Sequence, residues 1–255
     1  MPKIIINADD FGLDASVNRG IIGSFEKGYI SSTTIMANMP GFDEACRMAH
    51  AHGVTDRIGM HFNLTQGSAL TAPIRQKRRF CDGDGHFVFS KRRGIWLSGS
   101  EQAALAAELT AQWNKCLDAG IEPSHLDSHH HIQSAWGIAQ VIIGLSEKLG
   151  IKAVRKNWNT VPKDSFGRRV YHRFLEATYS RANLDATPYA TLPKHASQAI
   201  RNGMTPLEIM VHPTLMDGTI VDAMELRPMI EIFAEFDFSG RLCSYRDLLE
   251  CRNQQ

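Results

Sequence analysis

Two adjacent carboxylates, Asp9 and Asp10, follow directly on the apolar run "KIIINA" near the start of the chain. Like charges this close raise each other's pKa unless a cation or a proton separates them. A solvated turn is one reading of the pair, because Asp-Phe-Gly is common turn material. A metal site is the other reading, and it requires further ligands from distant parts of the chain.

Histidines at the ends of other strand-like segments can supply such ligands. His61 lies in "GMHFNLTQG" and His212 lies in "EIMVHPTL". The segment "SHLDSHHHIQ" carries a set at a spacing of two, namely His125, Asp127, His129 and His131. In an extended chain, residues at this spacing point to the same side. The segment therefore predicts a row of polar groups on one face of a strand.

Carboxylate and imidazole ligands suit Zn²⁺ and tolerate Mn²⁺, Co²⁺, Ni²⁺ or Fe²⁺. One carboxylate with two imidazoles leaves positions open for water or substrate, which is a catalytic arrangement. An additional carboxylate, Asp9, could accept a proton from the attacking water, and His212 could protonate a leaving group. These are the parts of an amide or ester hydrolase. The ligand set alone also describes a non-haem Fe(II) oxygenase.

Strand-like and helix-like segments alternate along most of the chain. The strand candidates are 4–8, 33–37, 58–64, 125–129, 152–156, 188–192, 207–212 and 242–245, and the clearest helical patterns are 41–53, 100–120, 136–150 and 226–236. This alternation predicts βαβ units and a parallel sheet. About seven or eight such units favour a (β/α) barrel of the TIM-barrel type over an open nucleotide-binding sheet. The carboxyl ends of the strands would then bring the aspartates and histidines to one mouth.

The composition narrows the class of protein further. Apolar residues make up 43% and charged residues 22%, with a net charge of +1, so nothing predicts capture of nucleic acid or of an anionic membrane. Five dispersed cysteines argue against a disulfide framework or a cysteine zinc site. With no leader and no apolar run of about 20 residues, we expect a cytoplasmic protein without a membrane span. A single domain over 1–255, with a hairpin excursion around 78–94, is expected.

Four motifs, in this order, resemble the YdjC-like carbohydrate deacetylases: "NADDFGLD", "GMHFNLTQG", "HLDSHHHIQ" and "MVHPTL". The resemblance implies a (β/α) barrel related to polysaccharide deacetylases. It also implies hydrolysis of N-acetyl groups on amino sugars or chitooligosaccharides. The implied cofactor is a divalent metal ion, with Zn²⁺ or Mg²⁺ first and Mn²⁺, Co²⁺ or Ni²⁺ as alternatives.

The resemblance also implies roles for individual residues. The metal ligands would be Asp10, His61 and His125, while Asp9 would be the general base and His212 the general acid. An outer ring of orienting groups would comprise Asp127, His129 and His131. Many relatives carry a further histidine where this chain has Gln133, so the resemblance implies an outer rim that differs from theirs at this position.

Two more residues are candidate substrate contacts. Arg155, in "AVRKN", could reach a sugar or form an ion pair at the mouth, and Trp158, in "KNWNT", could stack on a sugar ring or pack in the core. The substrate would be a small molecule or an oligosaccharide, with no nucleic acid, and a homodimer is the commonest closed assembly. The alternatives are a metal-assisted phosphoesterase and a carbohydrate-binding protein without turnover.

Overall fold

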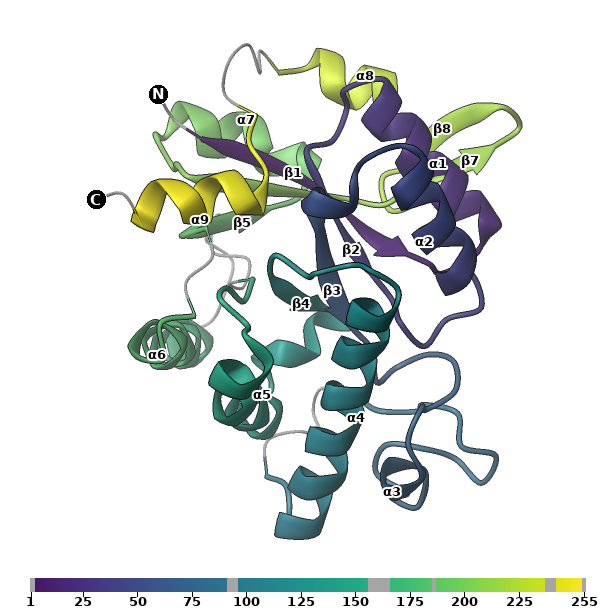
Figure 1. Ribbon diagram of the computed structural model, residues 1–255. Coiled ribbons are helices and arrows are strands. Elements are labelled where there is room, and N and C mark those ends of the chain that lie inside the picture. The colour runs from purple at the N-terminus through teal and green to yellow at the C-terminus, as the bar shows by residue number, and fades with distance from the viewer. Residues whose placement is uncertain (1–2, 91–95, 156–165, 185–186, 237–241, 254–255) are drawn as a thin grey trace.

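The computed structural model describes residues 3–90, 96–155, 166–184, 187–236 and 242–253 (Figure 1). Its centre is a six-stranded sheet in the order β4-β3-β2-β1-β6-β5, and every pairing in it is parallel. The strands are β1 (Ile4–Phe11), β2 (Ser32–Ile35), β3 (Ile58–Phe62), β4 (Leu126–Ser128), β5 (Tyr189–Thr191) and β6 (Leu207–Val211). β1, β2, β3 and β6 are buried over nearly their whole length, as strands covered on both faces must be.

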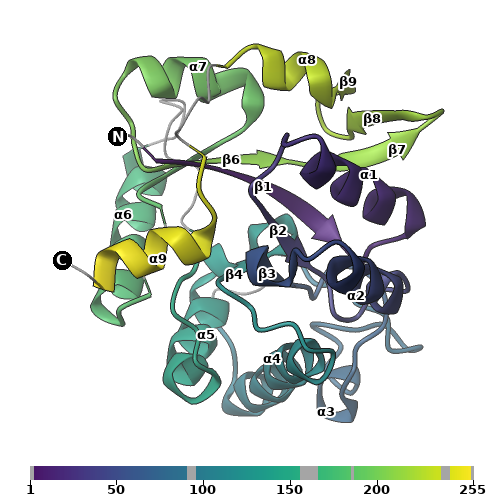
Figure 2. The ribbon, with the colours of Figure 1, turned by 45° about the horizontal axis from the view of Figure 1, so that its top comes forward.

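Helices surround this sheet, which curls into a half-barrel (Figure 2). They are α1 (Ala15–Glu26), α2 (Phe42–Ala51), α3 (Ala72–Arg75), α4 (Gly99–Asp118), α5 (Trp136–Leu149), α6 (Phe166–Arg181), α7 (Pro193–Arg201), α8 (Met229–Ala234) and α9 (Tyr245–Asn253), with short 3₁₀ turns η1 (Thr55–Arg57) and η3 (His129–Ser134). The prediction of a (β/α) barrel is confirmed in this half-barrel form.

Two of the eight predicted strands are reduced to single parallel bridges. Val154 pairs with Leu126 at one edge of the sheet, and Leu242 pairs with Ile4. The predicted strand 242–245 is short because a helix begins there. The Ser244 amide and hydroxyl donate to the Asp247 carboxylate, and the Asp247 amide donates back to the Ser244 hydroxyl at 3.2 Å. This reciprocal cap starts α9.

The longest predicted helix is confirmed with a shifted start. The pattern over 100–120 predicts a start at Ser100, whereas α4 begins at Gly99 behind the N-cap Ser98. Ser98 and Glu101 form a capping box, in which each side chain bonds the other residue's amide. α5 ends at Leu149, and Gly150, the last residue of the predicted range 136–150, caps it in the left-handed conformation at φ 72°.

A second, antiparallel sheet follows β6 and was not predicted. It contains β7 (Pro213–Met216), β8 (Thr219–Asp222) and β9 (Arg227–Pro228), and α1 packs against β7. The signal that could have found it is "DG" at Asp217–Gly218, where both residues have positive φ. Such a pair favours a two-residue hairpin turn.

The expected excursion around 78–94 contains antiparallel bridges between Cys81 and Phe87 and between Ser68 and His86, and its residues 91–95 lie outside the described chain. All five cysteines fall within the described chain, and all are free. Among the described helices, none combines the length and apolar character needed to cross a bilayer.

Candidate active site

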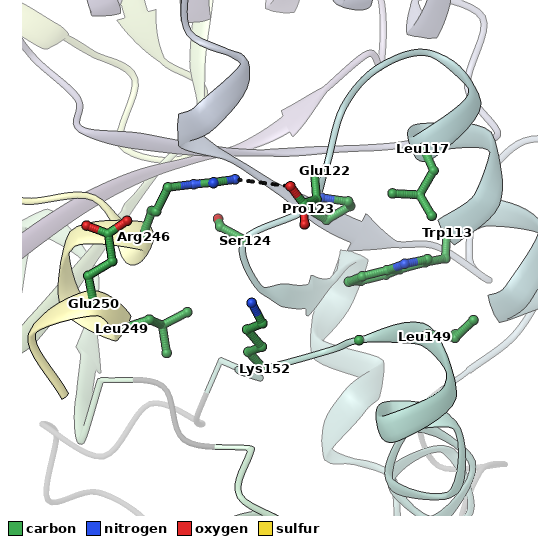
Figure 3. A pocket seen from close by; sticks show the side chains of 11 residues that line it. Trp113, Leu117, Glu122, Pro123, Ser124, Leu149, Lys152, Arg246, Leu249 and Glu250 are labelled. Atoms are coloured by element: carbon green, nitrogen blue, oxygen red, sulfur yellow. Dashed lines mark ion pairs between the residues drawn. The ribbon is translucent and has the colours of Figure 1, made fainter. Parts of the chain in front are cut away.

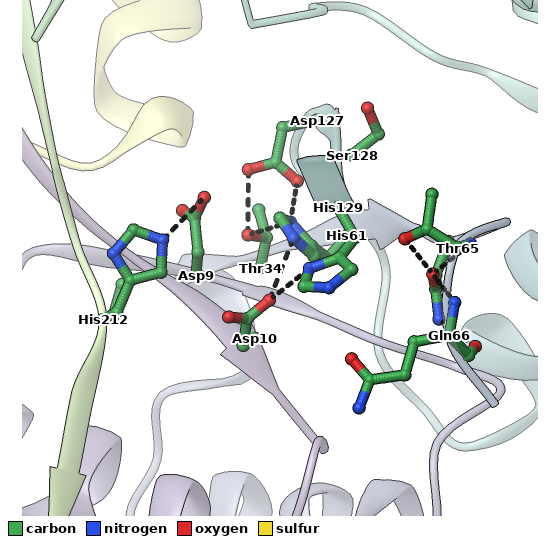
Figure 4. Close-up of polar contacts among 12 residues, drawn as sticks. Asp9, Asp10, Thr34, His61, Thr65, Gln66, Asp127, Ser128, His129 and His212 are labelled. Atoms are coloured by element: carbon green, nitrogen blue, oxygen red, sulfur yellow. Dashed lines mark hydrogen bonds and ion pairs between the residues drawn. The ribbon is translucent and has the colours of Figure 1, made fainter. Parts of the chain in front are cut away.

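The end of β1 directs both adjacent aspartates to the mouth of the half-barrel. In a regular strand neighbouring side chains point to opposite faces. Here the pairing with β2 shifts register between Ala8 and Phe11, and Asp10 takes the left-handed conformation at φ 71°. A local irregularity of this kind re-aims side chains. Asp9 and Asp10 consequently face different partners at the same mouth (Figure 4).

Asp10 meets two imidazoles from neighbouring strands. Its Oδ1 lies 3.1 Å from His61 Nε2 and 3.0 Å from His129 Nδ1. His61 stands on β3, and His129 follows the last residue of β4. These three residues form a group whose donor atoms all lie within 4.8 Å of one another. One carboxylate and two imidazoles are a donor set typical of catalytic zinc and related divalent ions.

The spacing and the charges of this trio both fit a divalent cation. A tetrahedral ion with bonds of about 2.0–2.1 Å separates its ligand atoms by roughly 3.3 Å, close to the observed contacts. Burial would raise the pKa of Asp10, but hydrogen bonds from His129 and His61 hold that pKa well below its usual range. Burial lowers the pKa of His61, yet Asp127 and Asp10 outweigh it and raise this pKa to about 10. Asp10 and Asp127 therefore favour positive charge at this position, and a divalent ion bound there would supply it.

Asp127 fixes the orientation of His61. Its Oδ1 lies 2.6 Å from His61 Nδ1, while its Oδ2 accepts the Thr34 hydroxyl at 3.0 Å. A carboxylate on the far nitrogen of a ligating histidine fixes the ring's tautomer and orientation. The Nε2 atom of His61 is therefore left to face Asp10.

Asp9 is held by a buried arginine. Arg155 Nη1 donates to Asp9 Oδ2 at 2.6 Å and Arg155 Nη2 donates to Asp9 Oδ1 at 2.7 Å, a bidentate pair. Asn7 Nδ2 also donates to Asp9 Oδ1 at 2.9 Å. Burial would raise the pKa of Asp9, but the Arg155 charge holds that pKa well below its usual range, so Asp9 stays ionised.

Arg155 itself pairs with three carboxylates from three strands. Besides Asp9, its Nη1 lies 2.7 Å from Asp127 Oδ2 and its Nη2 lies 2.6 Å from Glu208 Oε1. The group formed by Asp9, His61 and Asp127 also has metal-ligand spacing. The Arg155 guanidinium already contacts the two carboxylates of this group, Asp9 and Asp127. Arg155 therefore supplies the positive charge that a metal ion would otherwise bring to them. The arginine is fully buried, and it is neither at the rim nor exposed to a substrate.

His212 directly follows β6 and approaches Asp9 from the side opposite the imidazole pair (Figure 4). Its Nε2 lies 4.0 Å from Asp9 Oδ2. Its backbone amide donates to Asp222 Oδ2 at 2.7 Å, so β8 of the second sheet positions this histidine. Sequence reasoning missed Asp222, and the available clue was the "DG" hairpin signal at Asp217–Gly218, directly after the last residue of β7.

The structure places His125, expected as a metal ligand, outside the group formed by Asp10, His61 and His129. His125 lies directly before β4, and His129 lies directly after it. Their separation of four residues corresponds to about 13 Å of extended chain, so His125 is farther from the mouth. Its ring is fully buried and stacks on Tyr245 at 3.5 Å between centroids, and Ser124 Oγ lies 3.0 Å from its Nδ1. Residues at a spacing of two point to the same face of a strand, but they lie at different distances from the mouth of the half-barrel. His129, assigned to the outer ring, is the residue that reaches the mouth.

The remaining predicted residues lie around this centre. His131 is in the turn after His129, where its carbonyl accepts the Ser134 hydroxyl at 2.7 Å. Gln133, expected at the outer rim, is buried behind the same turn. Trp158 lies outside the described residues.

A pocket of about 310 Å³ occupies the opposite end of the half-barrel (Figure 3). Its walls include Trp113 of α4, Arg246 of α9, and Ser124 and Lys152, which precede β4 and the Val154 bridge. In parallel α/β folds, catalytic groups gather at the carboxyl ends of the strands. This pocket is therefore separate from the aspartate and histidine cluster.

A curled parallel sheet with an Asp–His–His donor set and an Asp–His pair at its carboxyl mouth defines a (β/α)-barrel protein with a candidate metal centre. The model of the YdjC-like protein family matches residues 3–239, and the chain belongs to that family.

Relatives of known name agree on one description. A carbohydrate deacetylase of Listeria monocytogenes is 34% identical over 222 residues, which cover 86% of this chain and 84% of that protein. A carbohydrate deacetylase of Vibrio cholerae is 33% identical over 217 residues, covering 84% and 79%. A carbohydrate deacetylase of Geobacillus stearothermophilus is 37% identical over 158 residues, 61% of each chain.

A solved structure shares the fold. A protein of Enterococcus faecalis described as a candidate cellobiose-phosphate cleavage protein superposes with a TM-score of 0.73 over 97% of this chain and 98% of its own. Its sequence identity of 21% supports the architecture alone.

Proposed function

We propose that this chain is a metal-dependent carbohydrate deacetylase that hydrolyses the N-acetyl group of an acetylated amino sugar or chitooligosaccharide. The observation that carries the proposal is the juxtaposition of two functional sets at one mouth. Asp10, His61 and His129 offer an open donor set, and Asp9 with His212 stands directly beside it. The names of the relatives supply the substrate class.

In this mechanism Asp10, His61 and His129 would hold a divalent ion, and Zn²⁺ would suit the two imidazoles best. Bound there, the ion supplies Lewis-acid polarisation of a carbonyl and lowers the pKa of water. Asp127 Oδ1 lies 2.6 Å from His61 Nδ1, which would keep the His61 Nε2 atom free to bind the ion beside Asp10.

Asp9 and His212 move the protons. Asp9 accepts a proton from the attacking water, and Arg155 fixes the orientation of its carboxylate throughout. His212 donates a proton to the sugar nitrogen as the C–N bond breaks, so that acetate and a free amine leave. His212 Nε2 lies 4.0 Å from Asp9 Oδ2, which supports an acid and a base that stand side by side at the mouth, next to the donor trio.

The test is acetate release by protein stripped of metal and reloaded separately with Zn²⁺, Mn²⁺, Co²⁺, Ni²⁺ and Mg²⁺. The substrates are N-acetylglucosamine, diacetylchitobiose and a longer chitooligosaccharide. We expect metal-dependent acetate release from at least one of these sugars. Stoichiometric metal binding without acetate release from any sugar would overturn the proposed reaction on free amino sugars.

A further inference from the structure

The loop that carries His129 has an unusual backbone. Directly after His129, His130 (φ 54°, ψ 23°) and His131 (φ 54°, ψ 39°) are both left-handed. This conformation is strained for a non-glycine residue, because it brings Cβ close to the following carbonyl oxygen. Consecutive residues of this kind persist only where surrounding contacts over-determine the backbone. The contacts that hold the loop therefore decide where the His129 ring stands.

Gln133 closes this loop against its own beginning. Its backbone amide donates to Ser128 Oγ at 2.9 Å, and the same hydroxyl donates to Gln133 Oε1. Ser128 is the last residue of β4, immediately before His129. The four residues from 129 to 132 are thus bracketed by one serine–glutamine pair, in which both side chains are buried.

Two tyrosines of α6 hold the far side of the loop. Tyr179 donates its hydroxyl to the Gln133 carbonyl at 2.8 Å, and Tyr171 donates to the Ser134 carbonyl at 2.7 Å. Tyr179 is buried, so its hydroxyl depends on this bond. α6 therefore acts on the site through the backbone that Gln133 anchors.

The Gln133 amide also reaches the residue that holds Asp9. Its Nε2 donates toward the Arg155 carbonyl at 3.5 Å, the longest contact of the set. The Arg155 side chain makes the bidentate pair with Asp9. One glutamine thus lies between the backbone of the arginine that orients the base and the loop that carries an imidazole of the donor trio.

We propose that Gln133 is a positioning residue for the metal centre, whose side-chain amide sets the place of the His129 ring relative to Asp10 and His61. The inference rests on the proposed function in taking these three residues as the metal ligands. The role needs one acceptor for the Ser128 hydroxyl and one donor toward the Arg155 carbonyl. Neutral imidazole has one acceptor and one donor on its ring, whereas a leucine side chain has neither.

The test compares Gln133→Leu and Gln133→His by titrating the metal-free, full-length protein with Co²⁺ and recording the visible absorption of the bound ion. Removing a group that orients a metal ligand typically weakens metal binding by about 10–100-fold. We expect this loss in Gln133→Leu with a changed Co²⁺ spectrum, and restoration to within about threefold in Gln133→His. Ser146→Ala, which removes a buried hydroxyl bond within α5, is the matched control.

Unchanged Co²⁺ affinity and spectrum in Gln133→Leu would overturn the inference, as would an equal loss in Ser146→Ala. If Gln133→Leu does not fold, Tyr179→Phe removes one hydroxyl from the same loop and should lower Co²⁺ affinity in the same direction. An unaltered affinity in that variant would then count against the role of Gln133. The readout needs no sugar, so a wild-type protein that binds Co²⁺ but releases no acetate contradicts only the proposed function.

Discussion

At the scale of single residues, the two adjacent aspartates differ through their partners. Asp10 contacts two imidazoles, and its carboxylate can share them with a divalent ion. Asp9 contacts a guanidinium, which keeps it ionised and oriented. Chemically identical side chains, one residue apart, are thus suited to a ligand and to a general base.

Asp10→Asn and Asp9→Asn should separate these two roles. We expect Asp10→Asn to lose metal and turnover together, because it removes the charged ligand. Asp9→Asn should keep stoichiometric metal while turnover falls by about 10²–10⁴-fold, the scale of general acid–base catalysis. Metal content and acetate release, measured on the same preparations, check the pair. Equal loss of metal in both variants would contradict this division.

Substitution of the two histidines on either side of β4 should affect metal binding differently. His129→Ala is expected to lose the metal, because one imidazole of the donor trio is removed. His125→Phe keeps a planar ring against Tyr245 and should retain the metal. The His125 ring lies 2.4 Å from the position that a Cβ on Gly59 would take, so the larger phenyl ring should be overpacked there and lower the unfolding free energy of the variant by about 1–3 kcal/mol. Co²⁺ titration and urea unfolding measure the two effects, and loss of Co²⁺ binding in a folded His125→Phe protein would contradict the structure.

At the scale of elements, Arg155 ties together strands that are not all neighbours in the sheet. Its carboxylate partners Asp9, Asp127 and Glu208 come from β1, β4 and β6, and the Tyr245 hydroxyl donates to the Glu208 carboxylate. β4 is separated from β1 by β3 and β2. The arginine therefore crosses the interior of the curled sheet, where a hydrogen-bonded ladder cannot reach.

Arg155→Met should destabilise the fold in a pH-dependent way. Removing one partner of a buried ion pair costs about 3–5 kcal/mol. The folded-state pKa of Asp9 lies below its ordinary 3.8, so the pair contributes stability above that pH and loses it as pH falls through the folded pKa. In the variant, burial without a cation raises the carboxylate pKa values.

The difference in unfolding free energy between wild type and Arg155→Met should consequently be largest at neutral pH and shrink below about pH 4. Urea unfolding at pH 7, 5 and 3.5 measures it. A difference that stays constant over this range would mean that the arginine contributes packing alone.

The contact between α1 and β7 depends on a glycine. A Cβ on Gly20 would lie 2.7 Å from Thr214 Cα and 2.8 Å from the Pro213 carbonyl oxygen, both backbone atoms. Gly20→Ala should therefore lower the unfolding free energy by about 1–3 kcal/mol. Gly144, inside α5, has no atom within 4 Å of such a Cβ.

Gly144→Ala is the matched control and should raise stability by about 0.4–1 kcal/mol. Thermal unfolding of both variants provides the measurement. Equal behaviour of the two alanines would contradict the close approach of α1 to β7.

At the scale of the whole molecule, burial determines which thiols can react. Cys46, Cys81 and Cys116 are buried, and burial raises the pKa of Cys46 and of Cys81 to about 11. Cys243 is half-buried and burial likewise raises its pKa to about 11, while Cys251 is exposed on α9. We expect a thiol reagent at pH 8 to label Cys251 rapidly and the other four only after unfolding. Rapid labelling of two or more thiols in the native protein would indicate a looser core.

Much of the fold was predictable because its signals are local. Apolar runs and helical spacing located every strand of the parallel sheet, since these patterns reflect burial on both faces or on one stripe. The second sheet was missed because its strands are short and partly exposed, although Asp217–Gly218 signals its turn. The arginine cluster could not be predicted, since its four charged residues come from distant segments.

The sequence by itself determined the residue types, the barrel class and the four segments that contribute to the mouth, because strand order and alternation follow from local hydrophobic patterns. Only the tertiary structure decided which histidine stands beside Asp10 and His61. His125 and His129 share a side of the chain, and the difference between them is depth along the strand direction. Depth depends on where β4 begins in the sheet and on the left-handed turn that Gln133 closes, and neither is encoded by spacing alone.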